Sequence, residues 1–254
     1  MIEATGIISI TPSANQMKKF LFSFIFPFTI FSFFAVAQAP AGEAGVNLTP
    51  ELAAGKDRAS RICSNCHGLD GQATKGGNSA ISPKITAQQN SYLVAKLKDY
   101  KSGKIEHPQM SLIAQMLSEQ DIDHVSEWYS RIKIDSPWFS EELASSVSTA
   151  NTMDQTLTPE AQAGKIKATQ ICSNCHGLYG QAVSGGNSVI VPNLTAQQLE
   201  YLVARLKDYK SGKIEHPQMS LVAKMLTEQD IKNVSAWYSG IEITVFDPGL
   251  GFSN

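Results

Sequence analysis

The stretch that organises this chain is Cys63-Ser64-Asn65-Cys66-His67-Gly68-Leu69, which occurs a second time as Cys172-Ser173-Asn174-Cys175-His176-Gly177-Leu178. The same offset of 109 residues (172 − 63) carries residues 101–112 onto 210–221 without a change or a gap. Repeats that share one solenoid core have periods of about 20–50 residues, so this offset indicates a duplicated domain. We place the two copies at residues 49–132 and 158–241, with a linker at 133–157 and a tail at 242–254.

Each copy contains the sequence patterns of several helices. Thr49-Pro50-Glu51 and its counterpart Thr158-Pro159-Glu160 each supply an N-cap hydroxyl, a proline for the first helical position and an acid for the first turn. Apolar residues at helical spacing predict a further helix over 86–100 and its copy 195–209, and Ser102-Gly103 ends the first of these.

The last helix of each copy is predicted to begin at a capping residue, Ser118 in the first copy. Its inner face consists of Ile122, Val125 and Tyr129, with Trp128 beside it. The chain has no alternation of polar and apolar residues long enough for a sheet. We therefore predict an all-α fold of two tandem domains related by internal duplication.

The composition excludes several classes of protein. A hydrophobic content of 43% over 254 residues is typical of globular domains rather than of disordered or fibrous chains. The 21 Lys and Arg residues nearly balance the 23 Asp and Glu residues, for a formal net charge of −2. Because no broad basic field is available to hold a phosphate backbone, we expect no nucleic-acid partner.

The first 37 residues have the organisation of an export signal. A charged start at Met17-Lys18-Lys19, which is also the better translation start, precedes the apolar run Phe20–Val36 and small residues. We expect cleavage after Ala37, because cleavage after Ala39 would leave Pro40 first. An uncleaved membrane anchor is the alternative, which the proline and alanines of this segment disfavour. The signal predicts a bacterial periplasmic protein.

The repeated Cys-x-x-Cys-His motif is typical of covalent haem attachment. Two thiols at this spacing can add to the two vinyl groups of a haem, and the next histidine is then held beneath the iron. A zinc site would need four ligands, a thioredoxin-type pair an α/β domain, and a disulfide would leave the histidine unexplained. We predict two covalently bound haem c groups, attached through Cys63, Cys66, Cys172 and Cys175, with His67 and His176 as axial iron ligands.

The sixth iron ligand must come from elsewhere in each copy. Met110 and Met219 are favoured, because they follow a loop-like stretch that can carry a thioether across the haem face. His107 and His216, each followed by proline, are the rivals. Met116 is interpreted as a core residue instead, since an apolar methionine at a helix edge is usually buried.

Taken together, these motifs resemble the dihaem cytochrome c4 family of bacteria. The resemblance runs from Thr49 to Ile241 and includes the two Cys-x-x-Cys-His-Gly motifs, the Thr-Ala-Gln-Gln stretches and the Leu-x-Glu-x-Asp-Ile helices. It implies two cytochrome c-like haem domains, in each of which the first and last helices cross. Its implied residues are Gly55 and Gly164 at the crossings, Met110 and Met219 as sixth ligands, and Pro83 and Pro192 as carbonyl acceptors for the axial histidines.

The implied function is electron transport. If both axial positions are filled, no open site remains for a substrate, so we expect an electron carrier rather than an enzyme. A dihaem peroxidase or a thiosulfate-oxidising cytochrome would need an open or displaceable ligand, such as a spare cysteine, and none is left. The expected role is a shuttle between respiratory donors, a cytochrome or dehydrogenase, and a terminal oxidase, with at most loose membrane association.

The alternative function is the dihaem electron-accepting subunit of a larger dehydrogenase. An exposed apolar patch at Pro137-Trp138-Phe139 or at Val245-Phe246 would favour this alternative. We expect instead that these residues pack within the linker region.

Overall fold

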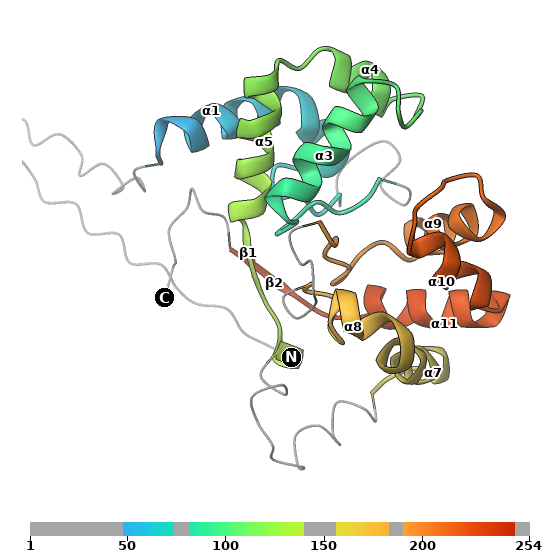
Figure 1. Cartoon of the computed structure of the whole chain (residues 1–254). Coiled ribbons are helices and arrows are strands. Elements are labelled where there is room, and N and C mark those ends of the chain that lie inside the picture. The colour runs from blue at the N-terminus through green and yellow to red at the C-terminus, as the bar shows by residue number, and fades with distance from the viewer. Residues whose placement is uncertain (1–47, 74–81, 140–155, 183–189, 247–254) are drawn as a thin grey trace, which may run out of the picture. The chain divides into compact units, whose positions relative to one another are not determined.

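The computed structural model describes residues 48–73, 82–139, 156–182 and 190–246 (Figure 1). The predicted signal at 1–37 lies outside these ranges, as do the middle of the linker and the end of the tail. Among the described residues, no helix is both long and apolar enough to cross a membrane. The first copy consists of α1 (Pro50–Arg58), α2 (Ser64–His67), α3 (Asn90–Lys101), α4 (Met110–Gln115) and α5 (Glu119–Arg131). The second copy repeats them as α7 (Pro159–Lys167), α8 (Ser173–His176), α9 (Leu199–Ser211), α10 (Met219–Met225) and α11 (Glu228–Ser239).

The predicted all-α class is confirmed, and local capping explains where several helices begin. The Thr49 hydroxyl accepts a hydrogen bond from the Leu52 amide at 3.3 Å, and proline holds the first position of α1. At α5, Ser118 and Asp121 form a reciprocal capping box, in which each side chain accepts a hydrogen bond from the other residue's backbone amide.

The helix predicted over 86–100 begins later, at Asn90. Ala87 adopts a positive φ of 50°, which a right-handed helix cannot include. Its amide donates to the Tyr129 carbonyl at 3.1 Å instead of to a helical neighbour. The preceding Thr86 hydroxyl likewise donates to the Asp70 carbonyl. These tertiary hydrogen bonds thus hold residues 86 and 87 in a turn that precedes the helix.

The first and last helices of each copy pack against each other, α1 on α5 and α7 on α11 (Figure 1). At these crossings a β-carbon on Gly55 would lie 2.1 Å from the His124 carbonyl oxygen, and one on Gly164 would lie 1.9 Å from that of Asn233. Neither distance is compatible with any side chain. The two glycines therefore let the helices approach until their backbones touch, as the family resemblance implies.

We expect Gly164→Ala to destabilise the second copy by about 3 kcal/mol or more, because the new methyl group meets a backbone carbonyl that only a helix shift can clear. Gly212→Ala is the matched control. Gly212 has a φ of 80°, but no other atom lies within 4 Å of the position that a β-carbon would take, so backbone strain alone applies and costs about 1 kcal/mol. Thermal unfolding followed by circular dichroism compares the two. Equal losses of stability would contradict this account of the crossing.

Two aromatic clusters form the cores, and each receives a residue from beyond the end of the other copy. Trp138, from the 3-10 helix Pro137–Phe139 in the linker, is only 5% exposed and packs edge-on against Trp237 of the second copy at a ring separation of 5.4 Å. Val245, from the tail, packs against the first copy's cluster around Trp128 and Tyr129. The expectation that these apolar residues pack rather than form an exposed patch is confirmed for Trp138 and Val245.

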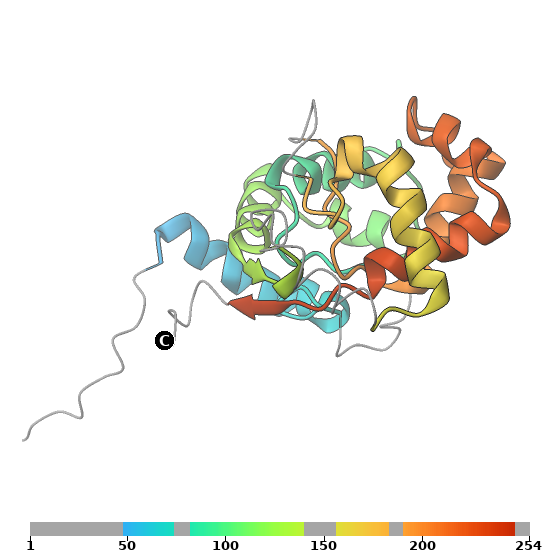
Figure 2. The ribbon, with the colours of Figure 1, turned by 90° about the horizontal axis from the view of Figure 1, so that it is seen from below.

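Linker and tail also pair as two short strands, β1 (Lys133–Asp135) and β2 (Thr244–Phe246), seen together in Figures 1 and 2. The strands are antiparallel, with Ile134 opposite Val245. Beyond them the Ser136 hydroxyl donates to the Glu242 carbonyl at 2.6 Å. Three residues are too few to show an alternating pattern, so no periodicity in the sequence marks this pair.

Candidate haem-binding sites

The Cys-x-x-Cys-His motif lies at the end of a continuous helical run. After α1 the chain widens into a π-helix over Ala59–Cys63 and then tightens into α2, which ends at His67 and is capped by Gly68 with a φ of 77°. The second copy repeats this with a π-helix over Ala168–Cys172. π-helical turns are rare and often occur at functional sites. The sequence carried no recognisable signal for this widened turn.

None of the four cysteines, all of which lie in the described ranges, forms a disulfide. Cys63 is partly buried, and burial raises the pKa of its thiol to about 11, as it does for Cys172. Cys66 and Cys175 are exposed. Among the described residues, no three His, Cys, Asp or Glu side chains gather as they would for a zinc ion. The donor set of each copy therefore suits thioether attachment better than a closed metal site.

The motif histidine is held by a backbone carbonyl. His67 Nδ1 lies 2.9 Å from the Pro83 oxygen, and His176 Nδ1 lies 3.0 Å from the Pro192 oxygen. Since a carbonyl can only accept, the proton is on Nδ1 and the lone pair on Nε2. Burial lowers the pKa of both rings, which favours their neutral form. A buried neutral imidazole with a fixed tautomer is what an axial iron ligand requires, so these residues fit a haem group.

The aromatic pair of the last helix fixes the backbone that follows this histidine. Trp128 Nε1 donates to the Leu69 carbonyl at 2.9 Å, and the Tyr129 hydroxyl donates to the Gly68 carbonyl at 3.0 Å. Trp237 and Tyr238 repeat both bonds in the second copy. The periodicity predicts that these rings face inward, but not that their polar atoms hold the haem motif.

Met110 and Met219 are partly buried, and each is the first residue of a short helix, α4 or α10. The preceding stretch is a loop, as expected. The structure thus places each methionine where a loop becomes a helix, at matching positions in the two copies.

His107, the rival ligand, has a capping role in the structure. Its Nδ1 accepts hydrogen bonds from the amides of Gln109 and Met110, at 3.3 and 3.2 Å. The ring also meets Tyr100 edge-on, with centroids 6.1 Å apart. Because Nδ1 accepts, the proton is on Nε2, and that nitrogen has no lone pair for a metal. His216 makes the same contacts, so this geometry favours the methionines over the histidines.

The interpretation of Met116 as a core residue is wrong. Its side chain is 65% exposed, and that of its counterpart Met225 is 66% exposed. Leu117 is buried in its place. The short helix α4 ends at Gln115, and Met116 lies in the turn that follows. This turn places Leu117, rather than Met116, in the core.

Comparison with known proteins identifies the family to which the chain belongs. No protein-family model matches the chain. It is 26% identical to cytochrome c4 of Pseudomonas aeruginosa over 200 residues, 75% of this chain and 89% of that relative. It is 36% identical to cytochrome c-554(548) of Halomonas halodenitrificans over 86 residues, 33% of this chain and 98% of that relative. It is 23% identical over 198 residues to a thiosulfate dehydrogenase electron acceptor of Stutzerimonas stutzeri, 74% of this chain and 82% of that relative.

Solved structures share the fold. Reduced recombinant cytochrome c4 from Pseudomonas stutzeri aligns with a TM-score of 0.58 at 22% identity, covering 75% of this chain and 98% of that one. Thiosulfate dehydrogenase from Marichromatium purpuratum also aligns with a TM-score of 0.58, at 23% identity, over 75% of this chain and 40% of that one. The cytochrome c-554(548) match covers nearly that whole relative, and the cytochrome c4 match is longer than either copy. The chain therefore belongs to the dihaem cytochrome c4 family of c-type cytochromes.

Proposed function

We propose that this chain is a periplasmic electron carrier with one haem c bound to each copy. The haems would be attached through Cys63 and Cys66 in the first copy and through Cys172 and Cys175 in the second. His67 with Met110, and His176 with Met219, would be the axial ligands. The observation that carries the proposal is the buried histidine beside each cysteine pair, with its Nδ1 committed to a proline carbonyl and its Nε2 left for iron.

The haem group, when bound, supplies a metal centre that gains and loses one electron. The protein's own residues decide what else it can do. A histidine and a methionine on opposite faces would leave no coordination position for a substrate, so the protein exchanges electrons only. The carbonyls of Pro83 and Pro192 hold the histidine rings in one orientation and thereby limit how far the ligands must move when the charge changes.

An optical spectrum of the oxidised protein tests this proposal. Methionine ligation gives a weak long-wavelength sulfur-to-iron band, and we expect that band from both sites. A high-spin signal in the purified protein would show an open iron site and would count against a pure carrier. The intact mass of the mature protein tests export, since retention of residues 20–36 would contradict a cleaved signal.

A second candidate function is the electron-accepting subunit of a dehydrogenase. Two relatives carry the name thiosulfate dehydrogenase electron acceptor, which motivates it. The carrier proposal instead expects a donor cytochrome or dehydrogenase on one side and a terminal oxidase on the other, met in transient encounters near the membrane. Size-exclusion chromatography of the native extract separates the two proposals. Co-elution with a dehydrogenase throughout purification would support the subunit.

We expect the haem of the second copy to have the higher reduction potential. In that copy Tyr179 is 6% exposed and packs against Trp138 and Trp237, whereas the matching position in the first copy is Asp70. A carboxylate stabilises the more positive ferric state, and an apolar surrounding does not. The nearby Lys84 offsets part of this effect.

Redox titration of the full chain and of Asp70→Asn tests this order. The substitution is expected to raise the lower of the two potentials and to leave the upper one unchanged. Tyr179→Phe, which keeps the ring, is the control. If Asp70→Asn raised the upper potential, the order would be reversed.

A further inference from the structure

Two glutamines join the copies by matching hydrogen bonds. Gln88 and Gln197 are equivalent under the 109-residue offset (197 − 88). The Gln197 side chain accepts from the Lys84 amide at 2.7 Å and donates to the Lys84 carbonyl at 3.0 Å. The Gln88 side chain makes the same two bonds to the backbone of Asn193, at 2.7 and 3.2 Å. One glutamine of each copy is thus hydrogen-bonded to both the amide and the carbonyl of one residue in the other copy.

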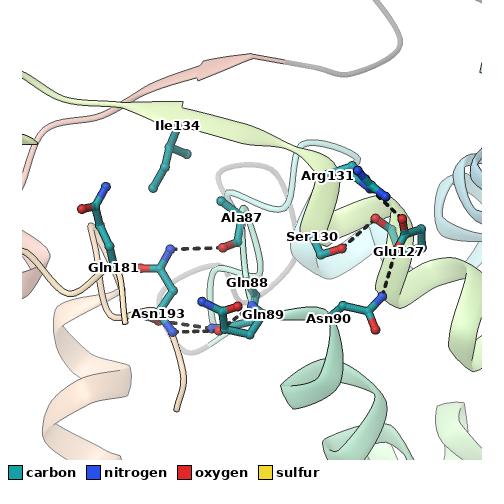
Figure 3. Close-up of a pocket in the computed structure, with 10 residues that line it drawn as sticks. All are labelled: Ala87, Gln88, Gln89, Asn90, Glu127, Ser130, Arg131, Ile134, Gln181 and Asn193. Atoms are coloured by element: carbon teal, nitrogen blue, oxygen red, sulfur yellow. Dashed lines mark hydrogen bonds and ion pairs between the residues drawn. The ribbon is translucent and has the colours of Figure 1, made fainter. Parts of the chain in front are cut away.

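Both side chains are buried and oriented. Gln88 is 4% exposed and Gln197 is 5% exposed. Each side-chain oxygen also accepts from the next residue's own amide at 3.0 Å, which keeps the oxygen turned toward its donors. Figure 3 looks into a cleft of about 510 Å³ beside the contact of Gln88 with Asn193, and shows the hydrogen bonds between these two residues. The Asn193 side chain adds a bond to the Ala87 carbonyl at 3.2 Å.

The two residues that the glutamines bind, Lys84 and Asn193, each directly follow the proline whose carbonyl accepts from a motif histidine. The Lys84 amide and the Pro83 carbonyl belong to one peptide group, and that carbonyl accepts from His67 Nδ1. The Asn193 amide and the Pro192 carbonyl are likewise one peptide group, bonded to His176. A continuous chain of hydrogen bonds therefore runs from each glutamine to the histidine of the other copy.

Hydrogen bonds in such a chain strengthen one another. A peptide whose N–H donates to a good acceptor is polarised, and its carbonyl then becomes a stronger acceptor. A stronger acceptor on Nδ1–H makes the imidazole a more electron-rich ligand, which stabilises ferric iron and lowers the potential.

We propose that Gln197 is a positioning residue for His67 and Gln88 for His176, so that each copy sets the reduction potential of the haem in the other. This inference rests on the proposed axial role of the two histidines. It also makes the potentials of the two haems depend on the contact between the copies.

Gln197→Met tests this relay, the hydrogen-bond path from each glutamine to the histidine of the other copy. Methionine keeps the approximate length of the side chain and removes both hydrogen bonds to Lys84. We expect the potential of the haem on Cys63 and Cys66 to rise, with its oxidised-to-reduced ratio at fixed solution potential falling roughly two- to tenfold, as expected for one lost hydrogen bond. The haem on Cys172 and Cys175 should not change. Gln88→Met is the matched control and should give the opposite pattern. The two haems are assigned by NMR of their ligand resonances.

This crossed pattern is what a merely structural role would not produce. A local disturbance would shift the reduction potential of the haem in the mutated copy. That result, or an unchanged potential at both haems, would overturn the proposal. Haem content and the long-wavelength band are recorded on the same samples. If both are normal and the crossed shift is missing, the relay fails while the carrier function stands; missing haem in the unmutated protein would defeat the carrier function itself.

A measurement on the unmutated protein covers the case in which the variants do not fold. The backbone amide protons of Lys84 and Asn193 are expected to exchange slowly with deuterium, because each is bonded to a buried side chain. Their rapid exchange in the folded protein would show that the glutamine contacts do not persist, and would overturn the proposal.

Discussion

Replacing Cys172 and Cys175 together by serine is expected to yield a protein with one haem instead of two. Serine hydroxyls do not add to the vinyl groups, so the second copy loses its covalent anchor. That copy is about 84 residues long (241 − 158 + 1), a size at which a domain depends on its cofactor for much of its core. We therefore expect it to unfold, and roughly half of the helical circular dichroism to disappear, since the helices are shared evenly between the copies.

The haem content is measured by the pyridine haemochrome assay and by intact mass. Cys63→Ser with Cys66→Ser should give the mirror result, with the first copy unfolded and the second intact. Ser173→Ala lies between the two cysteines and should retain both haems. Normal haem content in either double variant would show that these cysteines are not the attachment sites.

Met110→Ala is expected to leave both haems attached and to lower the potential of one of them, on the order of 100 mV, the scale on which axial ligands act. Alanine cannot coordinate iron, so one axial position opens. The long-wavelength band should fall to about half, because only one of two equivalent ligands is lost. Carbon monoxide should then bind to the reduced protein at that site alone.

Met116→Ala is the matched control for this change. It removes the same side chain six positions further along (116 − 110), where the thioether is 65% exposed, so spectrum and potential should both stay unchanged. His107→Ala is also informative. It removes the cap of α4 and is expected to destabilise that helix without opening the iron site. A low-spin spectrum with an unmoved potential in Met110→Ala would transfer the ligand role to His107.

The features that the sequence alone determined are those built from neighbouring residues. The starts of α1 and α5 were predictable because Thr49 and Ser118 cap amides only three positions away. The haem motif is predictable for a similar reason, since two thiols and a histidine within five residues have few other uses. The duplication needed only the comparison of the chain with itself, and it carries every prediction for one copy onto the other.

Only the tertiary structure decided the features that join distant parts of the chain. The start of α3 depends on Ala87 bonding to Tyr129, and the burial of Trp138 depends on the core of the second copy. The glutamine contacts join residues 105 and 113 positions apart. A side chain's partner at such separations is set by which backbone groups the fold leaves open, and neither spacing nor propensity encodes that.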